Sequence, residues 1–139
     1  MTTVGQRGKT AEAKVKDKLV AMESHTCTHY RFPDARAGSF TATPCDFMFM
    51  DSGRLHLLEI KEVNHTCRLS HKNFDLAQRA RMKNWQLAGA SAWVLIYFKP
   101  LALWRLIPLD DTAVRLGGSW DFAQWPLVTL EQALIDFRA

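Results

Sequence analysis

DFMFMDSGRLHLLEIK, residues Asp46–Lys61, is the stretch that decides the fold of this 139-residue chain. Residues 46–50 and 55–60 have the composition of β-strands, and the four residues between them carry a turn signal. We therefore predict a β-hairpin with Ser52 and Gly53 as its two loop residues.

The hairpin places two carboxylates opposite one another. Continuing the pairing from the loop sets Asp46 opposite Glu59, and Lys61 shares the face of Glu59 because side chains alternate along a strand. Opposed Cβ atoms lie about 5 Å apart, where two carboxylates repel by roughly 3 kcal/mol at an effective dielectric constant near 20. A good cross-strand pair contributes only about 0.2–1 kcal/mol. We expect a hard cation such as Mg²⁺ or a proton between the carboxylates, or else two side chains that splay apart at an exposed edge.

Length and composition are those of one globular domain. The net charge of +4 and the sequence pI of about 9.2 favour an anionic partner. No run of about 18 apolar residues is present, so we expect no membrane span, and the polar N-terminus is not a signal peptide. Three cysteines, an odd number, suggest a reduced, cytoplasmic compartment.

The rest of the chain alternates helical and strand patterns. Residues 1–9 read as a flexible basic arm. Helices are predicted at 10–24, at 74–88 with Asn73 as N-cap and Gly89 just past the end, and at 129–137 behind a capping box. Further strands are predicted at 27–33, at 92–98 in the sheet centre and at 101–107, with loops at 34–44, 62–73 and 110–126. This order predicts an α/β domain with a mixed β-sheet.

Two polar residues fall on apolar helix stripes. Glu12 lies on the stripe of the first helix, either as a functional carboxylate or as an acid favoured by the helix N-terminus. Gln78 lies on the apolar face of the second helix, either directed into a site or as a buried amide bonded to backbone. The apolar residues of these two stripes are Val15, Leu19 and Met22, and Phe74, Met82 and Trp85.

Asp46 followed by Glu59-Ile60-Lys61 resembles the motif of the PD-(D/E)xK nuclease superfamily. Other segments within residues 5–98 are similar to RecU-type Holliday junction resolvases: Gly5-Gln6-Arg7-Gly8 with Glu12, Thr43-Pro44-Cys45-Asp46, Glu59-Ile60-Lys61-Glu62, and Ser70-His71-Lys72-Asn73-Phe74 with Gln78 and Met82. The chain departs from that family in a short segment at 25–43, where the family has a longer basic stalk, and in Ala77, where the family has histidine.

The resemblance implies a restriction-endonuclease-like core, a mixed β-sheet flanked by helices, and a Mg²⁺- or Mn²⁺-dependent endonuclease. The DNA partner would be a four-way junction, cut by paired symmetric nicks, which calls for a homodimer. It also implies a role for each matched residue. Asp46, Glu59 and the Ile60 carbonyl would hold the metal, Lys61 would position the attacking water and stabilise charge on the phosphate, Glu12 would complete the acidic cluster, and Gln78 would orient water or substrate.

Three alternatives stay open. One is a restriction-, repair- or branched-DNA nuclease without junction specificity, favoured by the short stalk. The second is a zinc-binding interaction module built on His25, Cys27 and His29 or on His65, Cys67 and His71, although the usual paired ligand spacings are missing. The third is a DNA-binding protein without catalysis, which the complete acidic set argues against.

Candidate phosphate contacts come from scattered basic side chains, namely Arg7, Lys9, Arg36, Arg68 and Lys72. The tryptophans at positions 93, 104, 120 and 125 are interpreted as core or dimer-interface residues, not as platforms for base stacking.

Overall fold

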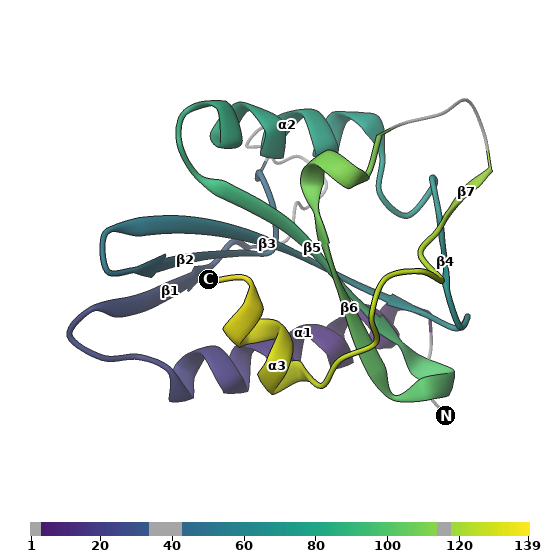
Figure 1. The fold of residues 1–139 in the computed structure, drawn as a ribbon, viewed down its shortest axis with the longest axis horizontal. Helices are drawn as coiled ribbons and strands as arrows, with labels where there is room; N and C mark the ends of the chain where they lie inside the picture. Colours follow the sequence, from purple (N-terminus) through teal and green to yellow (C-terminus); the bar gives the residue numbers. More distant parts are fainter. Residues whose placement is uncertain (1–3, 34–42, 114–117) are drawn as a thin grey trace.

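In a computed structural model of the protein, described over residues 4–33, 43–113 and 118–139, a five-stranded sheet is flanked by helices (Figure 1). The helices are α1 Val4–Ala21, α2 Leu76–Leu87 and α3 Leu130–Asp136, with 3-10 turns η1 Lys99–Leu101 and η2 Leu109–Asp111. The strands are β1 Cys27–Arg31, β2 Phe47–Asp51, β3 Arg54–Val63, β4 Arg68–Ser70, β5 Ser91–Phe98, β6 Leu103–Pro108 and β7 Ser119–Asp121. The predicted α/β fold class with a mixed sheet is confirmed.

The main sheet has the order β1-β2-β3-β5-β6, and only the β3–β5 pair is parallel. The predicted hairpin is confirmed in its register, since Asp51 pairs with Arg54 and Phe47 with Leu58. Ser52 and Gly53 both have positive φ, the backbone conformation that a tight two-residue hairpin loop requires. Because β2 begins at Phe47 while β3 runs on to Val63, the last part of β3 extends past the end of its neighbour.

Helices cover both faces of the sheet. Helices α1 and α3 lie on one face and α2 lies on the other (Figure 1). The alternation of β5 follows this layering, because Val94 and Ile96 join the core under α2 while Leu95 and Tyr97 join the core under α1 and α3. Residues 92–98 therefore form the predicted central strand, buried on both faces.

Several predicted boundaries are wrong. The first helix begins at Val4, so residues 4–9 are helical where a flexible arm was expected; the two glycines weaken a helix by about 1 kcal/mol each without ending it. The N-cap of helix α2 is Asp75, not Asn73 as predicted. The Asp75 carboxylate accepts a hydrogen bond from the backbone amide of Gln78. Gly89 does follow the helix, as predicted, and has a positive φ of 121°.

The predicted loops at 62–73 and 110–126 contain two strands that pair with each other. Strands β4 and β7 form a separate antiparallel ribbon, with Arg68 opposite Asp121 and Ser70 opposite Ser119. Each strand has three residues, too few for a periodic pattern to appear in the sequence. The predicted loop at 34–44 lies largely outside the described residues, as does Arg36.

Within the described part of the chain, no helix is both long and apolar enough to cross a membrane. None of the three cysteines is in a disulfide.

Candidate active site

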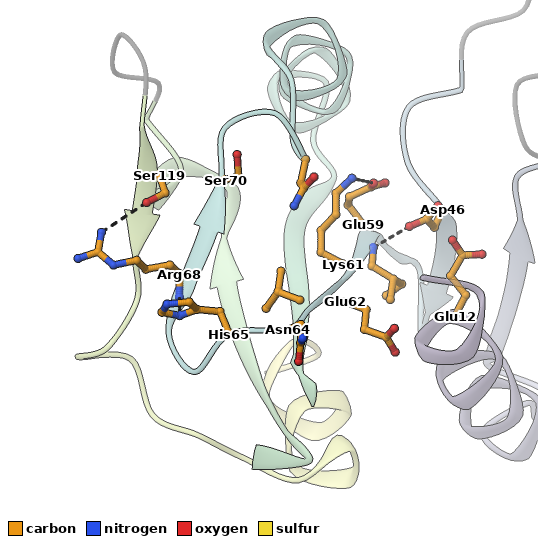
Figure 2. A pocket seen from close by; sticks show the side chains of 13 residues that line it. Glu12, Asp46, Glu59, Lys61, Glu62, Asn64, His65, Arg68, Ser70 and Ser119 are labelled. Carbon is orange, nitrogen blue, oxygen red and sulfur yellow. Dashed lines mark hydrogen bonds and ion pairs between the residues drawn. The ribbon is translucent and has the colours of Figure 1, made fainter. Parts of the chain in front are cut away.

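A cavity of about 590 Å³ opens where β3 runs past the end of β2. Acidic residues and Lys61 form one side of this cavity, and residues of the β4–β7 ribbon and the preceding loop form the other (Figure 2). The residues that line it are Glu12, Asp46, Glu59, Ile60, Lys61, Glu62, Val63, Asn64, His65, Arg68, Ser70, Asn73 and Ser119. We refer to it as the acidic cleft.

The side chain of Asp46 continues the hydrogen bonding between β2 and β3 past the end of β2. Asp46 lies one residue before β2, and its Oδ2 accepts a 2.7 Å hydrogen bond from the Ile60 amide. The amide and carbonyl of a strand residue point to the same edge of the strand, so the Ile60 carbonyl points toward Asp46 as well. The side chain is held in place because the preceding residue, Cys45, is buried and donates its thiol to the Phe47 carbonyl.

Glu59, Lys61 and Gln78 form a bonded group on the α2 side of β3. Lys61 Nζ lies 3.0 Å from Glu59 Oε2 and donates to Gln78 Oε1 at 3.4 Å. Gln78 Nε2 donates to the same Glu59 oxygen at 2.5 Å. Gln78 therefore bonds to the side chains of both charged groups and restrains them.

Glu12 reaches the cleft from α1 (Figure 2). Helix α1 lies on the opposite side of the sheet from α2, which carries Gln78. Glu12 Oε2 pairs with Arg31 Nη2 of β1 at 2.6 Å. Arg31 was not predicted as a site residue. Nothing local in the sequence links it to an acid nineteen residues earlier in the chain.

The electrostatics of the cleft favour neutral carboxyl groups in the absence of a cation. Burial, followed by repulsion from Glu59 and Glu12, raises the pKa of Asp46 from 3.8 to about 9, although the Ile60 amide and Lys61 act in the opposite direction. Burial also raises the pKa of Glu59, whose exposed fraction is 2%, against the opposing effects of Lys61 and Gln78. A pair of neighbouring buried acids with raised pKa values does not stabilise a fold. Such pairs are typical of functional sites.

The chemistry of this donor set fits a hard divalent cation. Glu59 Oε1 is buried and has no hydrogen-bond partner among the described residues. A buried oxygen without a partner destabilises the fold, so this atom is available to bind a ligand. Two carboxylates and a backbone carbonyl are the oxygen donors that Mg²⁺ and Mn²⁺ accept, with water in the remaining positions. Within the described ranges, no group of three His, Cys, Asp or Glu side chains is arranged to hold a metal ion, so a cation here would depend on the Ile60 carbonyl and water.

The predicted phosphate contacts are only partly placed. Arg68 lines the acidic cleft from the ribbon, with Nη2 3.5 Å from Asp121 Oδ2. Lys72 is exposed and does not line the cleft. The side chains of Arg7 and Lys9, and all of Arg36, lie outside the described residues.

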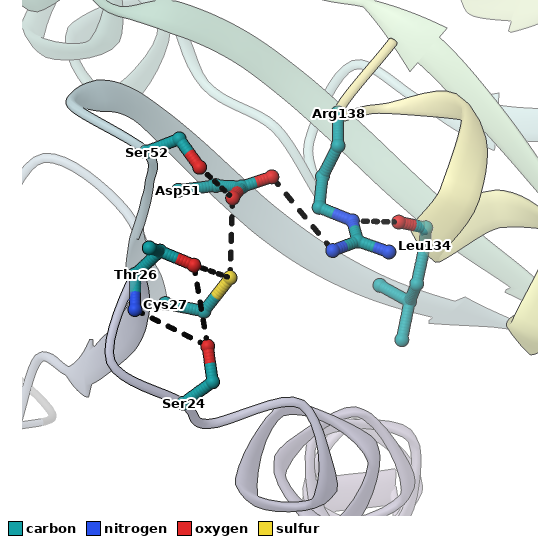
Figure 3. Close-up of polar contacts among 7 residues, drawn as sticks. All are labelled: Ser24, Thr26, Cys27, Asp51, Ser52, Leu134 and Arg138. Atoms are coloured by element: carbon teal, nitrogen blue, oxygen red, sulfur yellow. Dashed lines mark hydrogen bonds and ion pairs between the residues drawn. The ribbon is translucent and has the colours of Figure 1, made fainter.

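The zinc-module alternative is not supported by the geometry around Cys27. Its thiol donates to Asp51 Oδ1 at 3.1 Å, and Asp51 in turn lies 3.7 Å from Arg138 Nη1 (Figure 3). His29 Nδ1 lies 3.0 Å from Glu23 Oε1. Cys27 and His29, two of the expected ligands, are thus engaged with acids, and no metal-holding group is found in the parts of the chain that are described.

No family model matches the sequence, and no curated protein matches it. Several solved structures are similar, including those of two nucleases. Hjc, a Holliday junction resolvase from the archaeal hyperthermophile Archaeoglobus fulgidus, aligns with a TM-score of 0.64 at 19% identity, covering 92% of this chain and 98% of that one. A bacterial homing endonuclease, I-Ssp6803I, aligns with a TM-score of 0.51 at 13% identity. The alignment covers 93% of this chain and 77% of the endonuclease chain. At such identities the likeness shows the fold: this chain has the restriction-endonuclease-like fold of the archaeal resolvase.

Proposed function

We propose that this protein is a metal-dependent DNA endonuclease that hydrolyses phosphodiester bonds in the acidic cleft. The observation that carries the proposal is the convergence of Asp46, Glu59 and Lys61 at the point where β3 passes the end of β2. The fold shared with two DNA nucleases supports it.

In this proposal Asp46, Glu59 and the Ile60 carbonyl hold the divalent cation, Mg²⁺ or Mn²⁺. When bound, such a cation supplies Lewis acidity at a phosphate oxygen and neutralises charge that grows in the transition state.

The remaining roles belong to the protein's own groups. Lys61 stands beside Glu59 with its ammonium group directed at the cleft, where it stabilises negative charge on the phosphate and positions the attacking water. Gln78 restrains both partners, so it is a positioning residue. Glu12 extends the acidic cluster while Arg31 limits its repulsion of Asp46.

We propose further that the substrate is a four-way junction and that a homodimer makes two symmetric nicks. The likeness to an archaeal junction resolvase over nearly the whole of both chains supports this substrate, and paired cuts on a two-fold substrate call for two related active sites. A nuclease for other branched or duplex DNA is the second candidate, favoured by the fold shared with a homing endonuclease and by the short segment at 25–43.

The test is cleavage of a labelled four-way junction beside a linear duplex of matched sequence, with Mg²⁺ or Mn²⁺ and with EDTA. Asp46→Asn removes the charge but keeps an acceptor for the Ile60 amide. Asp51→Asn is the matched control, because Asp51 lies at the other end of β2, outside the cleft. We expect symmetric nicks in the junction alone, lost with EDTA and in Asp46→Asn and retained in Asp51→Asn. Equal cutting of both substrates would retain the nuclease and reject junction specificity, and no cutting with either metal would reject the nuclease.

A further inference from the structure

The β4–β7 ribbon also lines a second cavity. This cavity, of about 650 Å³, has the size of a small-molecule site and shares Arg68 and Ser119 with the acidic cleft. We call it the aromatic pocket. Its other principal lining residues are His71, Asp111, Trp120, Asp121, Phe122 and Trp125.

The aromatic pocket has an apolar floor and half-exposed aromatic sides. Trp120 and Phe122 are buried and stack on one another with an interplanar angle of 15°. His71 is fixed edge-on against Trp120, with ring centroids 4.1 Å apart. Trp125 and His71 are each only partly buried, so they leave aromatic surface facing the cavity.

The rim is acidic. Asp111 and Asp121 are exposed carboxylates that line the pocket. A carboxylate repels a phosphate, but it accepts hydrogen bonds from the exocyclic amino groups of adenine, cytosine and guanine. Aromatic faces with polar acceptors at the edge are the combination that binds an unstacked base.

Arg68 marks the boundary between the two cavities. It lies opposite Asp121 on the ribbon, and Nη1 donates to Ser119 Oγ at 3.4 Å. A cation at this place suits a phosphate that links a nucleotide in the acidic cleft to its neighbour.

We propose that the aromatic pocket receives one unstacked nucleobase carrying an amino group, from the DNA strand whose phosphodiester lies in the acidic cleft. The proposal rests on the nuclease function proposed above. It narrows the substrate to DNA in which a base next to the cut is unpaired or easily extruded, as at a branch point.

The test is a coupling experiment between one base and one side chain. Affinity of the full chain is measured in Ca²⁺ for a four-way junction and for the same junction with a single abasic site moved stepwise through the nucleotides around the branch. Stacking on one aromatic side chain corresponds to about a tenfold change in affinity. We expect Trp125→Leu and one abasic position each to weaken binding about tenfold, and their combination to weaken it no further.

Asp111→Asn provides a second variant at an exposed position, where folding is not at risk. It should weaken binding more when the base at that nucleotide is adenine, cytosine or guanine than when it is thymine, which has a ring N–H but no amino group. An equal effect with all four bases would contradict recognition of the amino group. Trp85→Leu is the matched control, an exposed tryptophan of α2 outside the pocket. Thermal unfolding of each variant confirms its fold.

Additive effects of Trp125→Leu and the abasic site at every position would overturn the base pocket. Cleavage in Mg²⁺ by the wild type is recorded on the same DNA, so additive effects with intact cleavage reject the pocket alone. A coupled position without cleavage supports the pocket while rejecting the nuclease, and failure to bind any of these DNAs rejects both.

Discussion

The Oδ2 atom of Asp46 accepts a 2.7 Å hydrogen bond from the backbone amide of Ile60, fourteen residues away on the neighbouring strand. This bond holds a carboxylate in the lining of the acidic cleft, where Glu59 and Glu12 repel its charge. It also aligns the Ile60 carbonyl with the same edge. The behaviour of Asp46 on protonation is therefore the most direct probe of the site.

The cation-free protein should lose stability as the pH rises from about 4 to about 9. Asp46 has a pKa of about 9 when folded and 3.8 as its ordinary value, so the folded state binds the extra proton in this window. Stability falls with pH wherever the folded state holds more protons than the unfolded state. Urea unfolding in EDTA at pH 5 and pH 8.5 measures the change, and the difference between the two should shrink in Asp46→Asn. An equal pH dependence in wild type and variant would contradict a raised pKa of Asp46.

The pKa of Asp46 should respond in opposite directions to two neighbouring substitutions. Glu12→Gln removes a like charge and should lower the pKa of Asp46. Arg31→Gln leaves the Glu12 carboxylate without its 2.6 Å partner and should raise the pKa of Asp46. Carbon-13 NMR of the aspartate carboxyl groups, followed through a pH titration of the cation-free protein, gives both shifts. Glu23→Gln serves as the control, because Glu23 pairs with His29 away from the cleft. Shifts of the same sign for both variants would refute the described geometry.

Binding of Mn²⁺ should release protons and stabilise the fold. Carboxyl groups must ionise to hold a cation, and both Asp46 and Glu59 have raised pKa values. Calorimetric titration at pH 7 in buffers of different ionisation enthalpy counts the protons released, and Tm should rise with Mn²⁺ concentration. Glu59→Gln should remove both effects. Asp110→Asn, an exposed acid paired with Lys83, should keep them; binding without proton release would show that the cation is held elsewhere.

Gln78→Met should lower cleavage by about 10- to 100-fold, the usual effect of removing a group that orients a metal ligand. Methionine keeps the length of the side chain and loses the bonds to Glu59 Oε2 and Lys61. Initial rates at saturating Mg²⁺ measure the loss. Gln86→Met on the same helix removes bonds to Lys83 and Asp110 at the surface and should leave the rate unchanged. Equal losses in the two variants would mean that α2 acts only through stability.

The hairpin and its chemistry follow from the sequence because they depend on local rules. A two-residue turn at Ser52-Gly53 sets the register, and the period of two puts Glu59 and Lys61 on one face. The same local logic placed Gln78 on the inward stripe of α2 and identified the buried central strand. The cap at Asp75 in place of Asn73 shows the usual limit of such rules at an element boundary.

Tertiary structure decided the rest, because the contacts involved join segments with no local pattern in common. The pairing of Glu12 with Arg31 depends on how α1 crosses the sheet, and the β4–β7 ribbon joins residues about fifty positions apart in strands of three residues. The raised pKa of Asp46 results from burial, which a sequence pattern does not measure. The sequence by itself determined which groups could perform the chemistry; long-range packing decided which of them share one cleft and what forms its second wall.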